Sequence, residues 1–306
     1  MKYDKKPLSF DEQADRLLAR GIIADRDLLV SRLHDVNYYR LSAYWYPFRQ
    51  NSSDALKANT TFERIWRFYT FDRRLRLLVI DAIERFEVSI RTRMTNAIAM
   101  KFGAFGYVDP KNLPGLHPSD HDKLLEKIRS EESQSKETFV KHFREKYAEE
   151  HDLPIWMACE LLSIGTLFTI YRGLEKHVQA DMAAEYRVPS KVLSSWLMTL
   201  NYVRNLCAHH ARLWNRELAI SPLVPRGHTH LDWNTPVYVL NSQRRLFAVV
   251  IVLKYVLNLV APQSKWPSRF DQLLADYPDV PLDWMGFPKN WSDCPIWKRF
   301  EGAEKH

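Results

Sequence analysis

The chain has 306 residues, of which 46% are hydrophobic and 26% are charged. This is the balance of a globular protein with a large core, and it excludes bulk disorder. A net charge of +7 and a pI of about 9.2 favour an anionic partner, most commonly nucleic acid, although the same charge would also serve solubility alone.

The cysteines and the apolar runs indicate the cellular compartment in which the protein resides. The three cysteines, Cys159, Cys207 and Cys294, are odd in number and form no C-x-x-C pair, which fits a reducing cytoplasm rather than a disulfide framework. The charged N-terminus lacks the apolar centre of a signal peptide. The longest apolar run, residues 246–253, is too short to cross a bilayer. We therefore expect a soluble, cytoplasmic protein with no membrane contact.

Helical periodicity dominates the chain and no strand pattern alternates, so the predicted fold class is all-α. In an N-terminal segment, residues 1–61, Ser9 and Glu12 form a capping-box pattern for a first helix that Gly21 should end. A second short helix is expected over residues 25–34. Residues 37–48 hold five aromatic rings before Pro47 with no clean period, which predicts an irregular aromatic plug, with base stacking as the alternative.

The central segment, residues 62–262, begins with a long helix expected over residues 62–100. Between positions 64 and 93 it carries eight arginines, no lysine and four acids. Two interpretations stay open: a solvated face with i,i+4 ion pairs such as Glu87–Arg91, or a surface that faces RNA or an active site. The RNA interpretation assigns phosphate contacts to Arg73, Arg74 and Arg76.

Further helices are expected beyond a Gly- and Pro-rich connection at residues 102–118. Two polar outer helices should cover residues 120–129 and 136–147. A helix from Pro154 to Tyr171 is apolar nearly all round and should be buried. Glu160 on it would then need a cation, from the long helix or from Arg204 and its neighbours.

The next helix should run from residue 191 to about 214, followed by a long loop and a buried helix over residues 237–261. The C-terminal tail, residues 263–306, holds four tryptophans and several prolines and should pack on the helices as an ordered coil.

Residues 204–216, with the sequence RNLCAHHARLWNR, are the most informative part of the chain. Histidine exchanges protons near neutral pH, arginine holds phosphate by two parallel hydrogen bonds, and an asparagine amide can fix an imidazole. On a helix Asn205 and His209 share a face, whereas Arg204 and His209 are about 140° apart. The two would converge better if each came from a different subunit. His210 continues the apolar stripe of Val203 and Cys207 and should point inward.

Other chemistries fit less well. Cys207, His209 and His210 contain metal-ligand types, but no C-x-x-C or H-E-x-x-H pattern accompanies them, and Pro118 interrupts the pair His117 and His121. We therefore expect no metal and no cofactor. No elbow motif for a nucleophile is present, and Cys207 lies on the buried stripe. Two rival hypotheses to catalysis remain. In the first, the protein is an RNA-binding or protein-binding module, and the motif only binds a phosphate or holds a dimer together. In the second, the motif is structural, and Arg204 and His209 are buried partners of Glu160.

The chain resembles the abortive-infection proteins of the AbiD/AbiF type. The resemblance spans roughly residues 8–220 and rests on residues 37–48, 71–76, 82–87, 154–156 and 203–216. These proteins are similar to HEPN ribonucleases, whose motif is Arg-x(4–6)-His, often with Asn after Arg. Type VI CRISPR ribonucleases carry the same signature. Arg204, Asn205 and His209 fit it without departure.

The resemblance implies a HEPN-type helical bundle, a composite active site in a homodimer, metal-independent RNA cleavage and phage defence, in some members under control of a small RNA. On this basis the chain is predicted to be an endoribonuclease in which the ribose 2′-OH attacks the adjacent phosphate. The predicted catalytic residues are Arg204, Asn205 and His209. The supporting residues are His210, Glu160, Glu87 and Arg212, and the RNA-binding residues are Arg73, Arg74, Arg76 and Arg216.

Overall fold

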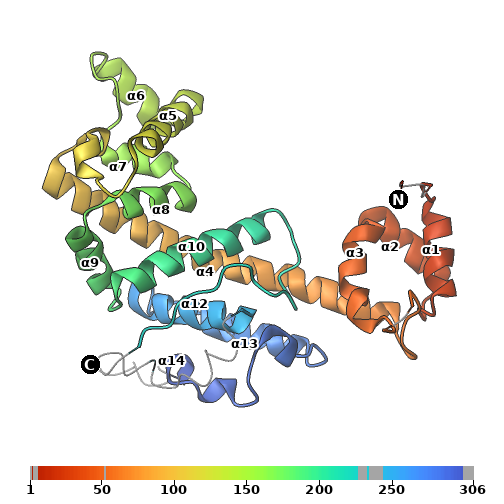
Figure 1. Ribbon diagram of the computed structural model, residues 1–306. Helices are drawn as coiled ribbons and strands as arrows, with labels where there is room; N and C mark the ends of the chain where they lie inside the picture. Colours follow the sequence, from red (N-terminus) through yellow and green to blue (C-terminus); the bar gives the residue numbers. More distant parts are fainter. Residues whose placement is uncertain (1, 3–5, 52, 227–232, 234–243, 299–306) are drawn as a thin grey trace. The chain divides into compact units, whose positions relative to one another are not determined.

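The computed structural model describes residues 2, 6–51, 53–226, 233 and 244–298 (Figure 1). Within these residues every regular element is helical, and the only β-type pairings are two isolated bridges, Ile23–Thr61 and Arg49–Leu56. The predicted all-α class is confirmed. No helix of the described part is long and apolar enough to cross a membrane.

The chain divides into two compact units. The first comprises Met1–Arg76 and Phe270–Val280, and the second comprises Leu77–Arg269 and Pro281–His306. These limits differ from the segments expected from sequence, because helices α4 (Phe62–Phe102) and α13 (Trp266–Asp276) each contribute residues to both units. The range of α4 confirms the long helix that the periodicity predicts.

The first unit holds α1 (Phe10–Ala19), α2 (Arg26–Asp35), α3 (Tyr38–Trp45), the 3₁₀ turn η1 (Tyr46–Phe48) and the start of α4. The capping box of α1 is present: the Ser9 hydroxyl accepts from the Glu12 amide, and the Ser9 amide donates to the Glu12 carboxylate. Gly21 follows α1 with a φ of +93°, which glycine adopts without strain.

The aromatic segment is a regular helix rather than the irregular plug expected. Asn37 caps α3 through its side-chain oxygen, which accepts from the Tyr39 amide. Tyr44 and Trp45 are buried, whereas Tyr39 is 85% exposed. The rings showed no clean period because some of them belong to the solvent face of the helix.

The second unit contains the rest of α4 and most of the remaining helices (Figure 1). They are η2 (Gly106–Val108), η3 (Pro110–Asn112), α5 (Pro118–Gln134), α6 (Thr138–Lys146), α7 (Ile155–Ala158), η4 (Cys159–Leu161), α8 (Ile164–Gly173), α9 (Lys176–Glu185), α10 (Ser190–Ala208), α12 (Leu246–Val260), η6 (Asp283–Met285), η7 (Trp291–Asp293) and α14 (Pro295–Lys298). Helix α10 packs against α8, α9 and α12. Its buried face includes Trp196, Leu200 and Val203, so the core of the unit fixes its position.

Three elements differ from expectation. The helix predicted from Pro154 to Tyr171 is interrupted at Leu162 and Ser163, so that α7 and η4 are separate from α8, and Trp156 is 47% exposed. Helix α12 begins at Leu246, and most of the expected residues before it lie outside the described part. The tail is not only coil, because α13 is an 11-residue helix in which Trp266 is fully buried.

Candidate active site at the end of helix α10

Helix α10 ends inside the predicted motif. Arg204 and Asn205 lie in its last turns, Ala208 is its last residue, and His209 is the C-cap. His210 has a φ of +56°, in the left-handed region. The motif therefore starts on the helix and finishes in the turn that follows it.

The turn closes the helix with a Schellman arrangement of backbone hydrogen bonds. The His210 amide donates to the Cys207 carbonyl over 3.0 Å, and the Ala211 amide donates to the Leu206 carbonyl over 2.8 Å. These two bonds satisfy carbonyls that the end of a helix leaves without a partner. Glycine is the usual residue at the left-handed position of this turn, because it has no Cβ. Here the position is occupied by His210.

The predicted helix to Trp214 and the inward-facing His210 were both wrong. Because the chain leaves the helix after Ala208, His210 does not continue the buried stripe, and His209 and His210 are both exposed. Leu213 and Trp214 are fully buried although they follow the helix. Their burial prolonged the apolar pattern past the true end of the helix and anchors the segment that follows the two histidines.

Arg204 and Asn205 are adjacent in space as well as in sequence. The Arg204 guanidinium donates to the Asn205 side-chain oxygen over 3.4 Å, and the Asn205 carbonyl accepts from the His209 amide over 3.0 Å. In the described part of the chain Arg204 forms no ion pair, so its charge is not offset by an internal carboxylate. Arg204, Asn205 and His209 thus occupy one helix end, with Asn205 and His209 exposed to solvent.

Arginine side chains form hydrogen bonds that hold the segment beyond the motif in place. The Arg216 Nε donates to the Arg212 carbonyl over 2.6 Å, and the Arg245 guanidinium donates to the Asn215 side chain over 3.4 Å. Arg216 and Arg212 are therefore part of the turn that carries Trp214. A contact of Arg216 with RNA remains a prediction.

Sequence reasoning did not single out Asn201, one helical turn before Asn205. A Cβ atom at Gly165 would lie 3.2 Å from the Asn201 amide group, so glycine at this point lets α8 pack closely against α10. The signal was the spacing of Asn201, Asn205 and His209 at intervals of four residues, which places them near one another on the helix surface.

The two acids predicted to support the site, Glu87 and Glu160, both form ion pairs with Arg91 of α4. Arg91 lies 3.0 Å from Glu87 and 3.9 Å from Glu160, and it donates to the Leu162 carbonyl over 3.0 Å. Of the two predicted sources of a cation for Glu160, the long helix provides it through Arg91. Glu160 is not buried, however, because its side chain is 58% exposed in the short turn η4.

This arrangement also contradicts the structural hypothesis for the motif. That hypothesis required Arg204 and His209 to be buried partners of Glu160. Instead His209 is exposed and the cation beside Glu160 is Arg91.

The comparison with protein-family models assigns the chain. The model of the Abi-like proteins matches residues 31–215, which is more than half of the chain and includes all of α10 and both histidines. The chain belongs to the Abi-like protein family. This membership suggests a role in abortive infection, a form of phage defence. No curated protein and no solved structure matched the chain.

In this Abi-like protein most arginines of α4 have internal acidic partners. Six of the eight form ion pairs: Arg67 with Asp279, Arg74 with Asp276, Arg76 with Asp72, Arg85 with Asp81, Arg91 with Glu87, and Arg93 with Glu185. Arg64 lies over the rings of Phe48 and Phe68. These arginines therefore bind other parts of the protein more than they form a free basic surface.

The three arginines assigned to RNA contacts have different environments. Arg76 is 5% exposed and paired with the fully buried Asp72, so its predicted place on an RNA-facing surface is wrong. The Tyr44 hydroxyl donates to the same carboxylate over 2.6 Å. Burial, followed by the charge of Asp72, raises the pKa of Tyr44 far above its usual range. Arg74 is exposed but lies 3.0 Å from Asp276, which leaves Arg73 as the exposed member without an ion pair in the described chain.

The cysteines and histidines of this Abi-like protein offer no evident metal site in the described residues, where no group of three or more metal-ligating side chains comes together. Cys159, Cys207 and Cys294 are free and buried. Burial raises the pKa of the Cys159 thiol to about 11, which keeps this sulfur protonated and unreactive at neutral pH.

Proposed function

We propose that this Abi-like protein is a metal-independent endoribonuclease that acts as a toxin-like effector in phage defence. The observation that carries the proposal is the helix end of α10, where Arg204, Asn205 and His209 lie together and His209 is open to solvent. These are the side-chain types that bind a phosphate and transfer protons without a metal.

In the proposed reaction the ribose 2′-oxygen forms a bond to phosphorus and the bond from phosphorus to the 5′-oxygen breaks. A neutral imidazole takes the proton of the 2′-OH, and an imidazolium gives a proton to the leaving 5′-oxygen. Arg204 stabilises the charge that develops on the phosphorane. Asn205 orients the arginine to which it is hydrogen bonded. The products are a 2′,3′-cyclic phosphate and a free 5′-OH.

The reaction needs two proton-transfer groups. A symmetric homodimer would bring two copies of His209 together, and closed two-fold dimers are the commonest oligomers. The exposure of His210 adds a second imidazole within one chain, beside the first. Light scattering during turnover distinguishes these arrangements: a dimer is expected, and full activity of a monomer would assign the second proton transfer to His210.

The reaction is tested with a short RNA that carries a single 2′-O-methyl group at the mapped cut site, in the presence of EDTA. We expect cleavage of the unmodified RNA, a cyclic phosphate end, and no cutting at the modified position because the nucleophile is missing. The pH–rate curve should be bell-shaped because one group acts as base and one as acid. Cutting at the modified position, or activity that requires added Mg²⁺, contradicts the mechanism.

RNA binding without any cleavage would identify the protein as a binding module instead. Sequencing the RNA that co-purifies with the protein tests whether a small structured RNA is its regulatory partner. That RNA should bind the wild-type protein and inhibit its cleavage of other RNA.

A further inference from the structure

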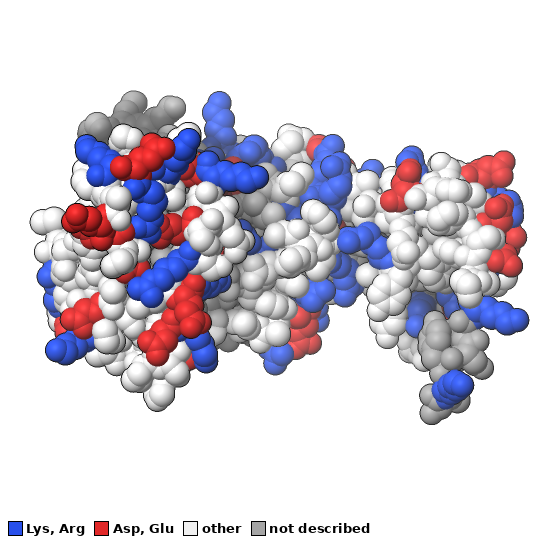
Figure 2. Space-filling view, turned by 90° about the horizontal axis from the view of Figure 1, so that it is seen from above, with Lys and Arg blue, Asp and Glu red and all other residues white. Residues whose placement is uncertain are grey.

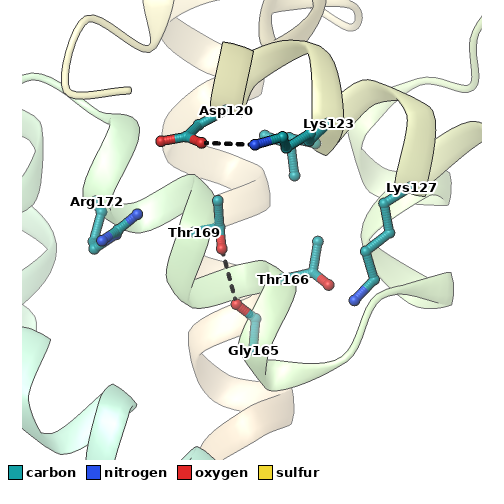
Figure 3. A pocket seen from close by; sticks show the side chains of 8 residues that line it. Asp120, Lys123, Lys127, Gly165, Thr166, Thr169 and Arg172 are labelled. Carbon is teal, nitrogen blue, oxygen red and sulfur yellow. Dashed lines mark hydrogen bonds and ion pairs between the residues drawn. The ribbon is translucent and has the colours of Figure 1, made fainter. Parts of the chain in front are cut away.

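The second unit contains a polar pocket between helices α5 and α8, with a volume of about 280 Å³. Helix α5 contributes Asp120, Lys123, Leu124 and Lys127, and helix α8 contributes Gly165, Thr166, Thr169 and Arg172. In Figure 3 Arg172 lies on one side and Lys127 on the other, with the side chains of Thr166 and Thr169 between them. Three cations face one carboxylate, so the pocket has a positive balance.

The cations of this pocket form fewer ion pairs than the arginines of α4. Lys127 and Arg172 form no ion pair with any described residue, and Lys123 lies 3.7 Å from Asp120, a long separation between two exposed groups. Figure 2 shows acidic and basic side chains interspersed on the surface that carries α5 and α6, so the positive charge of the pocket is local. Arg172 also lies over the ring of Phe168, 5.6 Å from its centroid, a contact that leaves its charge without an acidic partner. Cations without an ion pair around a hollow are suited to an anion of limited size.

The hydroxyl groups add hydrogen-bonding capacity to the floor of the pocket. Thr166 is 3% exposed and lies 3.3 Å from the Ser163 hydroxyl, in a pair where either oxygen can be the donor. When Ser163 donates, the hydrogen of Thr166 is available to a ligand. Phosphate oxygens accept hydrogen bonds from lysine, arginine and hydroxyl groups, which are the groups present here.

The pocket is linked to the motif through its wall. Gly165 lines the pocket and also packs against Asn201 of α10. Asn201 precedes His209 by eight residues, which is about 12 Å along a helix. Helix α8, which lines the pocket, is therefore packed directly against the helix that carries the motif.

We infer that the α5–α8 pocket binds a phosphate group of the RNA strand that the end of α10 cleaves. The inference deepens the proposed function and rests on it for the identity of the strand. Lys127 and Arg172 bind the phosphate oxygens, Thr166 donates a hydrogen bond, and Asp120 limits the affinity through its negative charge. The pocket is a positioning site, so it acts on substrate binding and not on the reacting atoms.

The test measures binding of a single-stranded RNA that is 2′-O-methylated throughout, so that it cannot be cleaved, to the full-length protein at several salt concentrations. The plot of log affinity against log salt has a negative slope. Lys127→Ala should make this slope less negative by about 0.7, the value for one phosphate on a single strand. Lys141→Ala is the matched control, since Lys141 is an exposed lysine of α6 outside the pocket. It should leave the slope closer to that of the wild type.

A second pair of variants removes a negative charge and should therefore strengthen RNA binding. Asp120→Asn removes the negative charge of the pocket and should tighten RNA binding roughly two- to fivefold, the range for one exposed charge interaction. Asp122→Asn, on the same helix but outside the pocket, is the control and should change affinity less. Equal effects within both pairs would overturn the inference. Tighter binding of AMP or inorganic phosphate than of RNA, measured by competition, would also overturn the assignment to an RNA strand.

This outcome is separable from that of the proposed function. If cleavage occurs but the pocket variants match their controls, the pocket inference fails alone. If the pocket variants change RNA binding but no RNA is cleaved under any condition, the ribonuclease proposal fails and the phosphate site stands.

Discussion

Two sets of basic residues in this protein differ in whether they form ion pairs with acidic residues of the same chain. The arginines of α4 are mostly paired with acids, some of which are more than two hundred positions away in the sequence, as Asp279 is from Arg67. Arg204 at the end of α10 and Lys127 and Arg172 of the α5–α8 pocket have no ion-pair partner in the described chain. The comparison shows that the number of arginines on a helix does not reveal how many of their charges are available to an external anion. What matters is whether each charge already has an internal partner.

The largest effect should come from His209. Replacing it with alanine should lower the rate of RNA cleavage by roughly 10²–10⁴-fold, because general acid–base catalysis contributes that much. The side chain is exposed, so fold and RNA affinity should be kept. Single-turnover cleavage assays measure the rate, and thermal unfolding provides the control. A His209→Ala protein with the wild-type rate would exclude the assignment.

The buried pair in the first unit should dominate its stability. Arg76→Met removes the partner of the fully buried Asp72 and should lower the free energy of unfolding by about 3–5 kcal/mol, the loss typical when one member of a buried ion pair is removed. Arg73→Met, three positions earlier on the exposed face, should change it by less than about 0.5 kcal/mol. Denaturant titration measures both values. Similar losses in the two variants would contradict the distinction between paired and free arginines.

A smaller effect should separate Arg73 from Arg74. Arg74 is paired with Asp276, whereas Arg73 is exposed without an ion pair in the described residues. If α4 contacts RNA, Arg73→Ala should lower the salt dependence of binding by up to about 0.7 and Arg74→Ala should lower it less. Filter binding over a range of salt measures the slopes. No change in either variant would leave α4 a purely structural helix.

The smallest effect concerns the exposed pair Arg67–Asp279. The Arg67 guanidinium, at 2.7 Å, lowers the pKa of the Asp279 carboxyl. A lowered pKa adds stability above the unfolded pKa, and this stability is lost as the pH falls through the folded value. Asp279→Asn should therefore lower the free energy of unfolding by less than about 1 kcal/mol at neutral pH, and the difference should vanish in acid. A difference that grows on acidification would contradict this sign.

The sequence was sufficient for the features that depend on local pattern. The periodicity of α4 and the capping box at Ser9 and Glu12 are each contained in one continuous stretch of sequence. The end of α10 was not predictable in this way, because its turn has a histidine where glycine would have given the signal. The interruption before α8 also lacks a glycine or proline at Leu162 and Ser163.

The α5–α8 pocket could not be found from sequence for a different reason. Its residues come from two helices, with Asp120 and Gly165 45 positions apart, and each helix alone carries an ordinary polar face. The spacing of Thr166, Thr169 and Arg172 at intervals of three residues marks one face of α8, but only the packing shows that this face lies against Lys123 and Lys127.

The left-handed backbone at His210 sets two requirements on one position. The backbone there favours glycine, whereas proton transfer near neutral pH favours an imidazole. Natural selection for stability and selection for activity would therefore choose different residues at position 210. A library of all substitutions at this position, sorted once for thermal resistance and once for toxicity in cells, would rank glycine high in the first and histidine high in the second only if this imidazole takes part in the reaction.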